Sequence, residues 1–160
     1  MENKFDLIRR GRENFIRLID DLDLDTLNKV PTGFNNNLAW HLGHIIASQQ
    51  IICYSFSGQQ PKIKEEYINK YRKGTRPEAD IDEAELNELK DLLFSTLSAT
   101  ESDFAAGVFT NYKPVTLSFG NTLNSIADAL AFVPVHDSLH LGYAMALRRA
   151  VLADVQNTAG

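Results

Sequence analysis

A chain of 160 residues is long enough for one domain with a substantial core and short for two, so we expect a single domain over residues 1–160. A net charge of -5 and the lack of a long run of Lys or Arg argue against nucleic acid as a partner. No apolar run approaches the ~18 residues that span a bilayer, which argues against an integral membrane protein.

The beginning of the chain and its one cysteine suggest a compartment. The segment MENKFDLIRRGREN has no apolar core of a signal peptide. Cys53 cannot form an internal disulfide, which fits a reducing cytoplasm. It lies in the apolar run IICYSF, so we expect a buried, inert thiol rather than a nucleophile.

The first predicted helix runs from near Glu2 to near Asp21. Its apolar residues recur at spacings of three, four and seven: Phe5, Ile8, Phe15, Ile19 and Leu22. Charged residues lie between them, and we expect the basic cluster of Arg9, Arg10 and Arg12 to form a solvated face.

The second predicted helix begins after a cap at Asn36 or Asn37 and ends at Gly58. It is apolar around most of its circumference, which predicts burial against several neighbours. His44 lies inside its second apolar stripe, and His41 lies between the two stripes.

A polar connection from Gln59 to Asp80 follows, and connections of this length often cover a site. Within it, KIKEEYINKYRKG predicts a short helix that presents Tyr67 and Tyr71 on one side. Asp82 and Glu85 form a capping box for a third long helix, which ends near Gly107.

The last part of the chain predicts one more long helix. The segment VFTNYKPVTLSFG reads as an extended linker or a short hairpin, and Asn121 or Thr122 can cap the helix after it. Pro134 predicts a kink, or else two separate helices. Four long amphipathic helices predict an all-α four-helix bundle, whose long middle connection allows a crossover.

His136 and His140 are one turn apart in this last helix, so their rings share one face. That face is apolar, and two imidazoles in an apolar stripe are costly unless something joins them. A metal ion is one answer, because it binds one nitrogen of each neutral ring. A third histidine on another buried helix, His41 or His44, would complete the ligands of an open catalytic metal site.

Two segments, NLAWHLGHIIAS and TLNSIADALAFVPVHDSLHLGY, resemble the signature helices of the DinB/YfiT-like superfamily, whose members are regarded as metalloenzymes. The resemblance covers nearly the whole chain. It implies an up-down-down-up four-helix bundle, often a homodimer, with a metal held by His44, His136 and His140. Gly142 matches the usual glycine of the family. Tyr143 stands where a glutamine often follows, which puts a family-wide role of that glutamine in doubt.

The resemblance also implies a reaction class. Some relatives are transferases or isomerases that depend on a low-molecular-weight thiol such as mycothiol, bacillithiol or glutathione. The expected cofactor is a divalent transition metal, zinc or nickel before iron or copper. The function is then thiol-dependent transfer on a small molecule or, second, hydrolysis by a metal-hydroxide. The alternative is a non-catalytic metal- or ligand-binding bundle.

Other candidate pocket residues carry weaker expectations. Tyr143, Tyr67 and Tyr71 could line the pocket, but aromatic residues at helical spacing belong more often to the core. Asp128 and Asp137 flank the histidine face, so we expect both to face solvent. No general base stands out.

Overall fold

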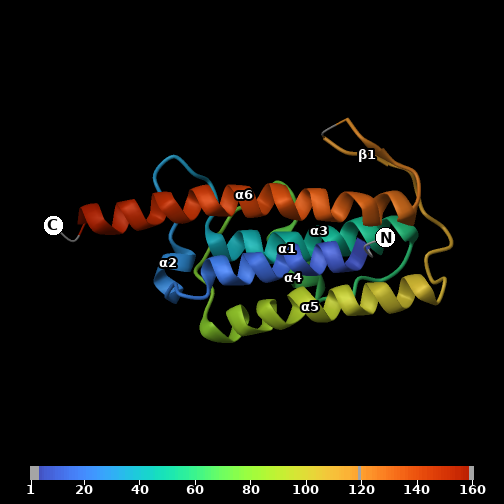
Figure 1. Cartoon of the computed structure of the whole chain (residues 1–160), viewed down its shortest axis with the longest axis horizontal. Helices are drawn as coiled ribbons and strands as arrows, with labels where there is room; N and C mark the ends of the chain where they lie inside the picture. The colour runs from blue at the N-terminus through green and yellow to red at the C-terminus, as the bar shows by residue number, and fades with distance from the viewer. Residues whose placement is uncertain (1–3, 119, 159–160) are drawn as a thin grey trace.

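The computed structural model describes residues 4–118 and 120–158, and it is all-α apart from one small hairpin (Figure 1). The elements in chain order are α1 (Lys4–Ile19), α2 (Leu24–Asn28), α3 (Leu38–Cys53), the 3-10 helix η1 (Ser55–Ser57), α4 (Glu65–Tyr71), α5 (Glu83–Ala105), β1 (Val115–Thr116), β2 (Thr122–Leu123) and α6 (Ile126–Thr158). In the described ranges, no helix is both long and apolar enough to cross a membrane.

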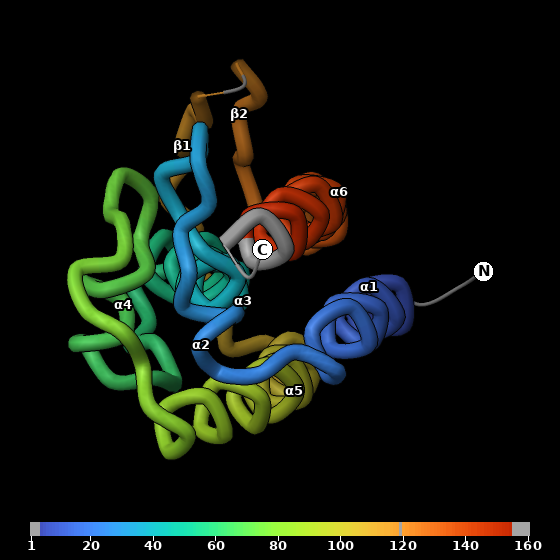
Figure 2. Tube along the Cα trace, turned by 90° about the vertical axis from the view of Figure 1, so that its left-hand side faces the viewer, coloured from blue at the N-terminus to red at the C-terminus, as the bar shows by residue number. Residues whose placement is uncertain are grey.

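The four longest helices, α1, α3, α5 and α6, lie alongside one another (Figures 1 and 2), and all four contribute residues to each of two hydrophobic clusters. Helix α3 packs against α4, α5 and α6, while α1 packs against α5 and α6. Every residue of α3 except Ile51 is buried, as its two apolar stripes predicted. The helix that carries two of the histidines is therefore held from several sides.

Two helix starts follow the predicted capping chemistry. The side chain of Asn37 accepts a hydrogen bond from the Trp40 backbone N–H at 2.7 Å, and that of Asp82 accepts one from Glu85 at 2.8 Å. Each bond satisfies one of the backbone donors that the first turn of a helix leaves unpaired.

The cap at Asp82 gives a simple stability prediction. Asp82→Ala should lower the free energy of unfolding by about 1 kcal/mol, because the exposed Glu85 N–H loses its partner. Asp82→Asn is the matched control, since asparagine caps a helix as well as aspartate does. Urea denaturation of both variants checks this. Equal losses would show that the cap itself contributes nothing.

The prediction of a cap at Asn121 or Thr122 for the last helix was wrong. Thr122 lies in β2, where it pairs with Thr116 of β1, and α6 begins only at Ile126. The Ser125 hydroxyl accepts the hydrogen bond from the Asp128 N–H at 3.2 Å. The segment before α6 forms the short hairpin, which was one of the two predicted alternatives. Because Thr122 is part of this hairpin, it does not cap the helix.

Helix α6 runs unbroken through Pro134, so the alternative of two separate helices was wrong. A proline removes only one helical N–H donor, and the packing of a long helix can outweigh that loss. The carbonyl of Pro134 also accepts a hydrogen bond from the Ser138 hydroxyl at 2.7 Å. The kink stays a prediction.

The basic cluster of α1 is not one solvated face, as the sequence suggested. Arg9 is partly exposed and pairs with Glu101 at 3.3 Å, but Arg12 is fully buried. Arg12 lies in the same helical stripe as Ile8 and Phe15, so the face that α1 turns toward the core includes a guanidinium group.

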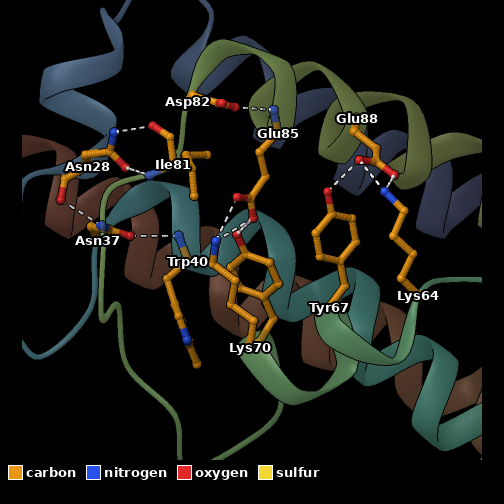
Figure 3. A network of polar contacts seen from close by, with 11 residues as sticks. Asn28, Asn37, Trp40, Lys64, Tyr67, Lys70, Ile81, Asp82, Glu85 and Glu88 are labelled. Atoms are coloured by element: carbon orange, nitrogen blue, oxygen red, sulfur yellow. Dashed lines mark hydrogen bonds and ion pairs between the residues drawn. The ribbon is translucent and has the colours of Figure 1, made fainter.

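The long connection between α3 and α5 is fixed by polar contacts between α4 and α5 (Figure 3). The hydroxyl groups of Tyr67 and Tyr71 donate to Glu88 and Glu85 at 2.6 and 2.5 Å. Both rings are buried, so these tyrosines belong to the core.

Candidate metal centre

Helices α3 and α6 bring His44, His136 and His140 together. One nitrogen from each of the three rings can be chosen so that all three lie within 4.8 Å of one another. His44 is buried, and the other two are partly buried. The structure therefore places the three histidines that the sequence singled out in one cluster.

The orientation of His44 is set by a backbone carbonyl. Its Nδ1 lies 2.7 Å from the carbonyl oxygen of Tyr71, which can only accept, so a neutral His44 carries its proton on Nδ1. Its Nε2 then has a free lone pair, 3.2 Å from the Ser48 hydroxyl. The ring is also stacked on Trp40, with centroids 4.5 Å apart and planes at 13°. This is the state of a histidine that can bind a metal through Nε2.

His140 is supported by the fourth histidine. Its Nδ1 lies 2.9 Å from Nδ1 of His41, so one of these nitrogens donates to the other. If His140 is the donor, its Nε2 is free to bind a metal. His41 itself is buried on α3.

His136 has a buried carboxylate beside it. Asp137 is only 4% exposed, and its Oδ1 lies 3.7 Å from Nδ1 of His136. Its Oδ2 accepts a hydrogen bond from Nε of Arg12 at 3.0 Å. The expectation that Asp137 faces solvent was therefore wrong, because α1 covers that side of α6 and supplies a buried counter-charge.

Asp128, the other flanking carboxylate, has a local structural contact. It is partly buried near the start of α6, and its Oδ2 accepts a hydrogen bond from the Asn124 N–H at 2.9 Å.

Burial favours the neutral form of His41, His44 and His140. It lowers the pKa of His41 and His44 to about 4, and that of His140 to about 2, with further lowering from neighbouring histidines. Metals bind the neutral imidazole, so these rings need no deprotonation at neutral pH. The donor set fits a divalent transition metal.

The cluster forms part of the wall of a large cleft, about 1080 Å³ in volume. Tyr143 and Ser48 also line it, whereas Tyr67 and Tyr71 do not. His41 lines it as well, yet its Nε2 is buried and has no hydrogen-bond partner among the described residues. Cys53 is fully buried, as predicted, and burial raises the pKa of its thiol to about 12.

Sequence reasoning missed Arg12 and Asp137 as parts of the site. The signal for Arg12 was present: it falls on the apolar stripe of α1, one turn after Ile8. Asp137 gave no such signal, because its burial depends on a partner 125 residues away.

Comparisons with known proteins agree with this fold. The structure is similar to the crystal structure of a conserved protein from Enterococcus faecalis, with a TM-score of 0.64 and 14% sequence identity. The similarity covers 94% of this chain and 95% of that one, and at this identity it shows the fold alone. A search of curated proteins found no match. The model of the DinB superfamily matches residues 7–144, a range that includes all four histidines, and the chain belongs to this superfamily.

Proposed function

We propose that this protein is a metal-dependent enzyme acting on a small molecule, with His44, His136 and His140 as the metal ligands. One observation carries the proposal: three histidines from two helices converge at the wall of a cleft of about 1080 Å³. Three protein ligands leave a position for substrate, as in catalytic rather than structural metal sites.

A metal held there would supply Lewis acidity, which lowers the pKa of a bound thiol or water at neutral pH. The proposed reactions are thus transfer that depends on a low-molecular-weight thiol or, second, hydrolysis. The chain's own part is to hold the ligand rings. The Tyr71 carbonyl fixes the proton of His44 on Nδ1, and His41 supports His140.

A non-catalytic ligand-binding protein is the second candidate, and two contacts favour it. The Ser48 hydroxyl satisfies Nε2 of His44, and the bond between His41 and His140 satisfies two further nitrogens within the protein. A cluster so bonded can persist without a metal.

Three further expectations remain proposals. The first is an up-down-down-up four-helix bundle, which the colour gradients of the four long helices in Figure 1 support. The second is a homodimer, and exposed apolar residues of α6 such as Val135, Leu139 and Met145 support it. The third is a cytoplasmic location.

Elemental analysis of purified protein tests the metal. We expect close to one transition-metal ion per chain, and its loss in His140→Ala. His41→Ala should weaken metal binding about 10- to 100-fold without abolishing it, because it removes the histidine that is bonded to His140 but no proposed ligand. Equal metal content in wild type and His140→Ala would refute the site.

The reaction class can be tested spectroscopically. In cobalt-substituted protein, a small thiol that binds the metal should shift the visible spectrum. No shift with glutathione or other small thiols would argue against thiol-dependent transfer and leave hydrolysis or simple binding.

A further inference from the structure

The connection between α3 and α5 carries three paired lysines and two basic residues that line the cleft without an ion pair in the described part of the chain. Three lysines form ion pairs with acidic residues of α5: Lys64 with Glu88, Lys70 with Glu85 (Figure 3) and Lys62 with Asp103. Lys73 and Arg76 are exposed and line the cleft, and neither has an ion-pair partner among the described residues. A chain with a net charge of -5 thus leaves two cations unpaired at its large cleft.

The turn that carries these two cations is held in place. Nε1 of Trp40 donates to the Thr75 hydroxyl at 3.0 Å. That hydroxyl is also 2.8 Å from the Lys70 and Arg72 carbonyls, to either of which it can donate. Gly74 adopts a φ of +89°, which allows the chain to turn there. The contact of Thr75 with Trp40 fixes the turn beside the start of α3.

The other end of the cleft is apolar. Ile52 lies about 18 Å along α3 from Trp40, from a rise of about 1.5 Å per residue. Together with Phe56 it lines the cleft at that end. From α6, Phe132 lies next to the histidine cluster, its ring centroid 6.0 Å from that of His136. The histidines therefore lie between a basic end and an apolar end.

We propose that the cleft takes a small amphipathic anion. Lys73 and Arg76 bind its negatively charged head group, and the pocket around Ile52, Phe56 and Phe132 holds its apolar part. Arginine suits carboxylate, phosphate and sulfonate groups because its planar donors can bind two oxygens at once. Glu78 also lines the cleft, and its charge opposes the binding. The inference rests on the proposed function in one respect, namely that the substrate binds in this cleft.

The test uses octane-1-sulfonate as the probe and metal-free protein, so that no metal can hold the head group. Trp40, the chain's one tryptophan, lines the cleft and reports binding through its fluorescence. We expect the sulfonate to bind about 10-fold more tightly than octan-1-ol. Lys73→Gln and Arg76→Gln should each weaken binding about 3-fold, in line with single exposed charge pairs, and added salt should reduce the difference.

Two controls separate a site from general attraction. Arg72 is also exposed and belongs to the same connection, but it does not line the cleft, so Arg72→Gln should leave the affinity unchanged. Glu78→Gln should tighten binding, about 2- to 3-fold, because it removes an opposing charge.

Equal binding of the sulfonate and the alcohol would overturn the proposal, as would a preference for octyltrimethylammonium. An effect of Arg72→Gln as large as that of Arg76→Gln would also overturn it. The metal proposal fails separately, through the metal content of wild type and His140→Ala. A wild-type protein that binds metal, but whose affinity for the sulfonate is unchanged by Lys73→Gln and Arg76→Gln, refutes the substrate class alone.

Discussion

Asp137→Asn should lower the free energy of unfolding by about 3–5 kcal/mol, because it leaves a buried guanidinium without its counter-charge. Arg12 is fully buried, and its ion pair with Asp137 at 3.0 Å neutralises it. Arg12 also donates from Nη1 to the Leu93 carbonyl at 2.6 Å, which ties α1 to α5 as well as to α6. Urea denaturation measures the loss.

A control for this prediction lies on the same helix. Arg9 pairs with Glu101 at 3.3 Å, but both side chains are more than a third exposed, at 34% and 38%. Arg9→Met should therefore change the free energy of unfolding by less than about 1 kcal/mol. Similar losses of stability in Asp137→Asn and Arg9→Met would contradict the claim that disrupting a buried ion pair costs more than disrupting an exposed one.

The double variant Arg12→Met/Asp137→Leu separates stability from metal binding. Replacing both charges with apolar groups of similar volume should restore much of the lost stability, since a buried pair contributes little net free energy. It also removes the carboxylate oxygen that lies 3.7 Å from Nδ1 of His136. If this oxygen accepts a hydrogen bond from Nδ1 of His136 when a metal is bound, metal affinity should fall about 10- to 100-fold, the usual effect of losing a group that orients a ligand. Wild-type affinity in a stable double variant would show that the pair has a purely structural role.

These buried charges mark where sequence reasoning reached its limit. Capping at Asn37 and Asp82 is local chemistry over four residues: the sequence predicted the cap at Asp82 and left the other one to Asn36 or Asn37. Arg12 and Asp137 are buried because α1, α5 and α6 pack together around them. A charged residue considered by itself is expected to be exposed. The mid-stripe position of Arg12 was the one local sign.

The histidines divide in the same way. The spacing of His136 and His140 placed both on one face of a helix, and the structure of α6 agrees. The sequence alone left His41 and His44 open, because both lie on a helix that is buried nearly all around. The crossing of α3 with α6 decides their contacts: His44 joins the cluster of three, and His41 reaches His140 from the side.

Gly43→Ala should destabilise the protein by about 1–3 kcal/mol, because α3 and α4 leave no room for a methyl group there. A Cβ on Gly43 would lie 2.5 Å from Cγ of the Tyr71 ring. That ring cannot move aside easily, since it is buried and its hydroxyl donates to Glu85 at 2.5 Å. Helix propensity alone would predict the opposite sign, because alanine is favoured over glycine by about 1 kcal/mol.

Gly11→Ala provides the matched comparison. Gly11 lies within α1, and a Cβ there would meet no atom within 4 Å, so the alanine should stabilise the protein by about 0.5–1 kcal/mol. Thermal or urea unfolding of the two variants should therefore show shifts of opposite sign. Equal stabilisation by both would mean that the contact between Gly43 and Tyr71 relaxes without cost.

The same substitution should reach the metal centre through the backbone. The Tyr71 carbonyl holds the Nδ1–H of His44 at 2.7 Å, so any shift of Tyr71 away from α3 loosens the orientation of that ring. We expect Gly43→Ala to bind metal more weakly than Gly11→Ala, measured by fluorescence of Trp40, which stacks on His44. A stability loss with unchanged metal affinity would show that the Tyr71 carbonyl is not needed to orient His44. A loss of both would link the packing of α4 on α3 to the chemistry of the cluster.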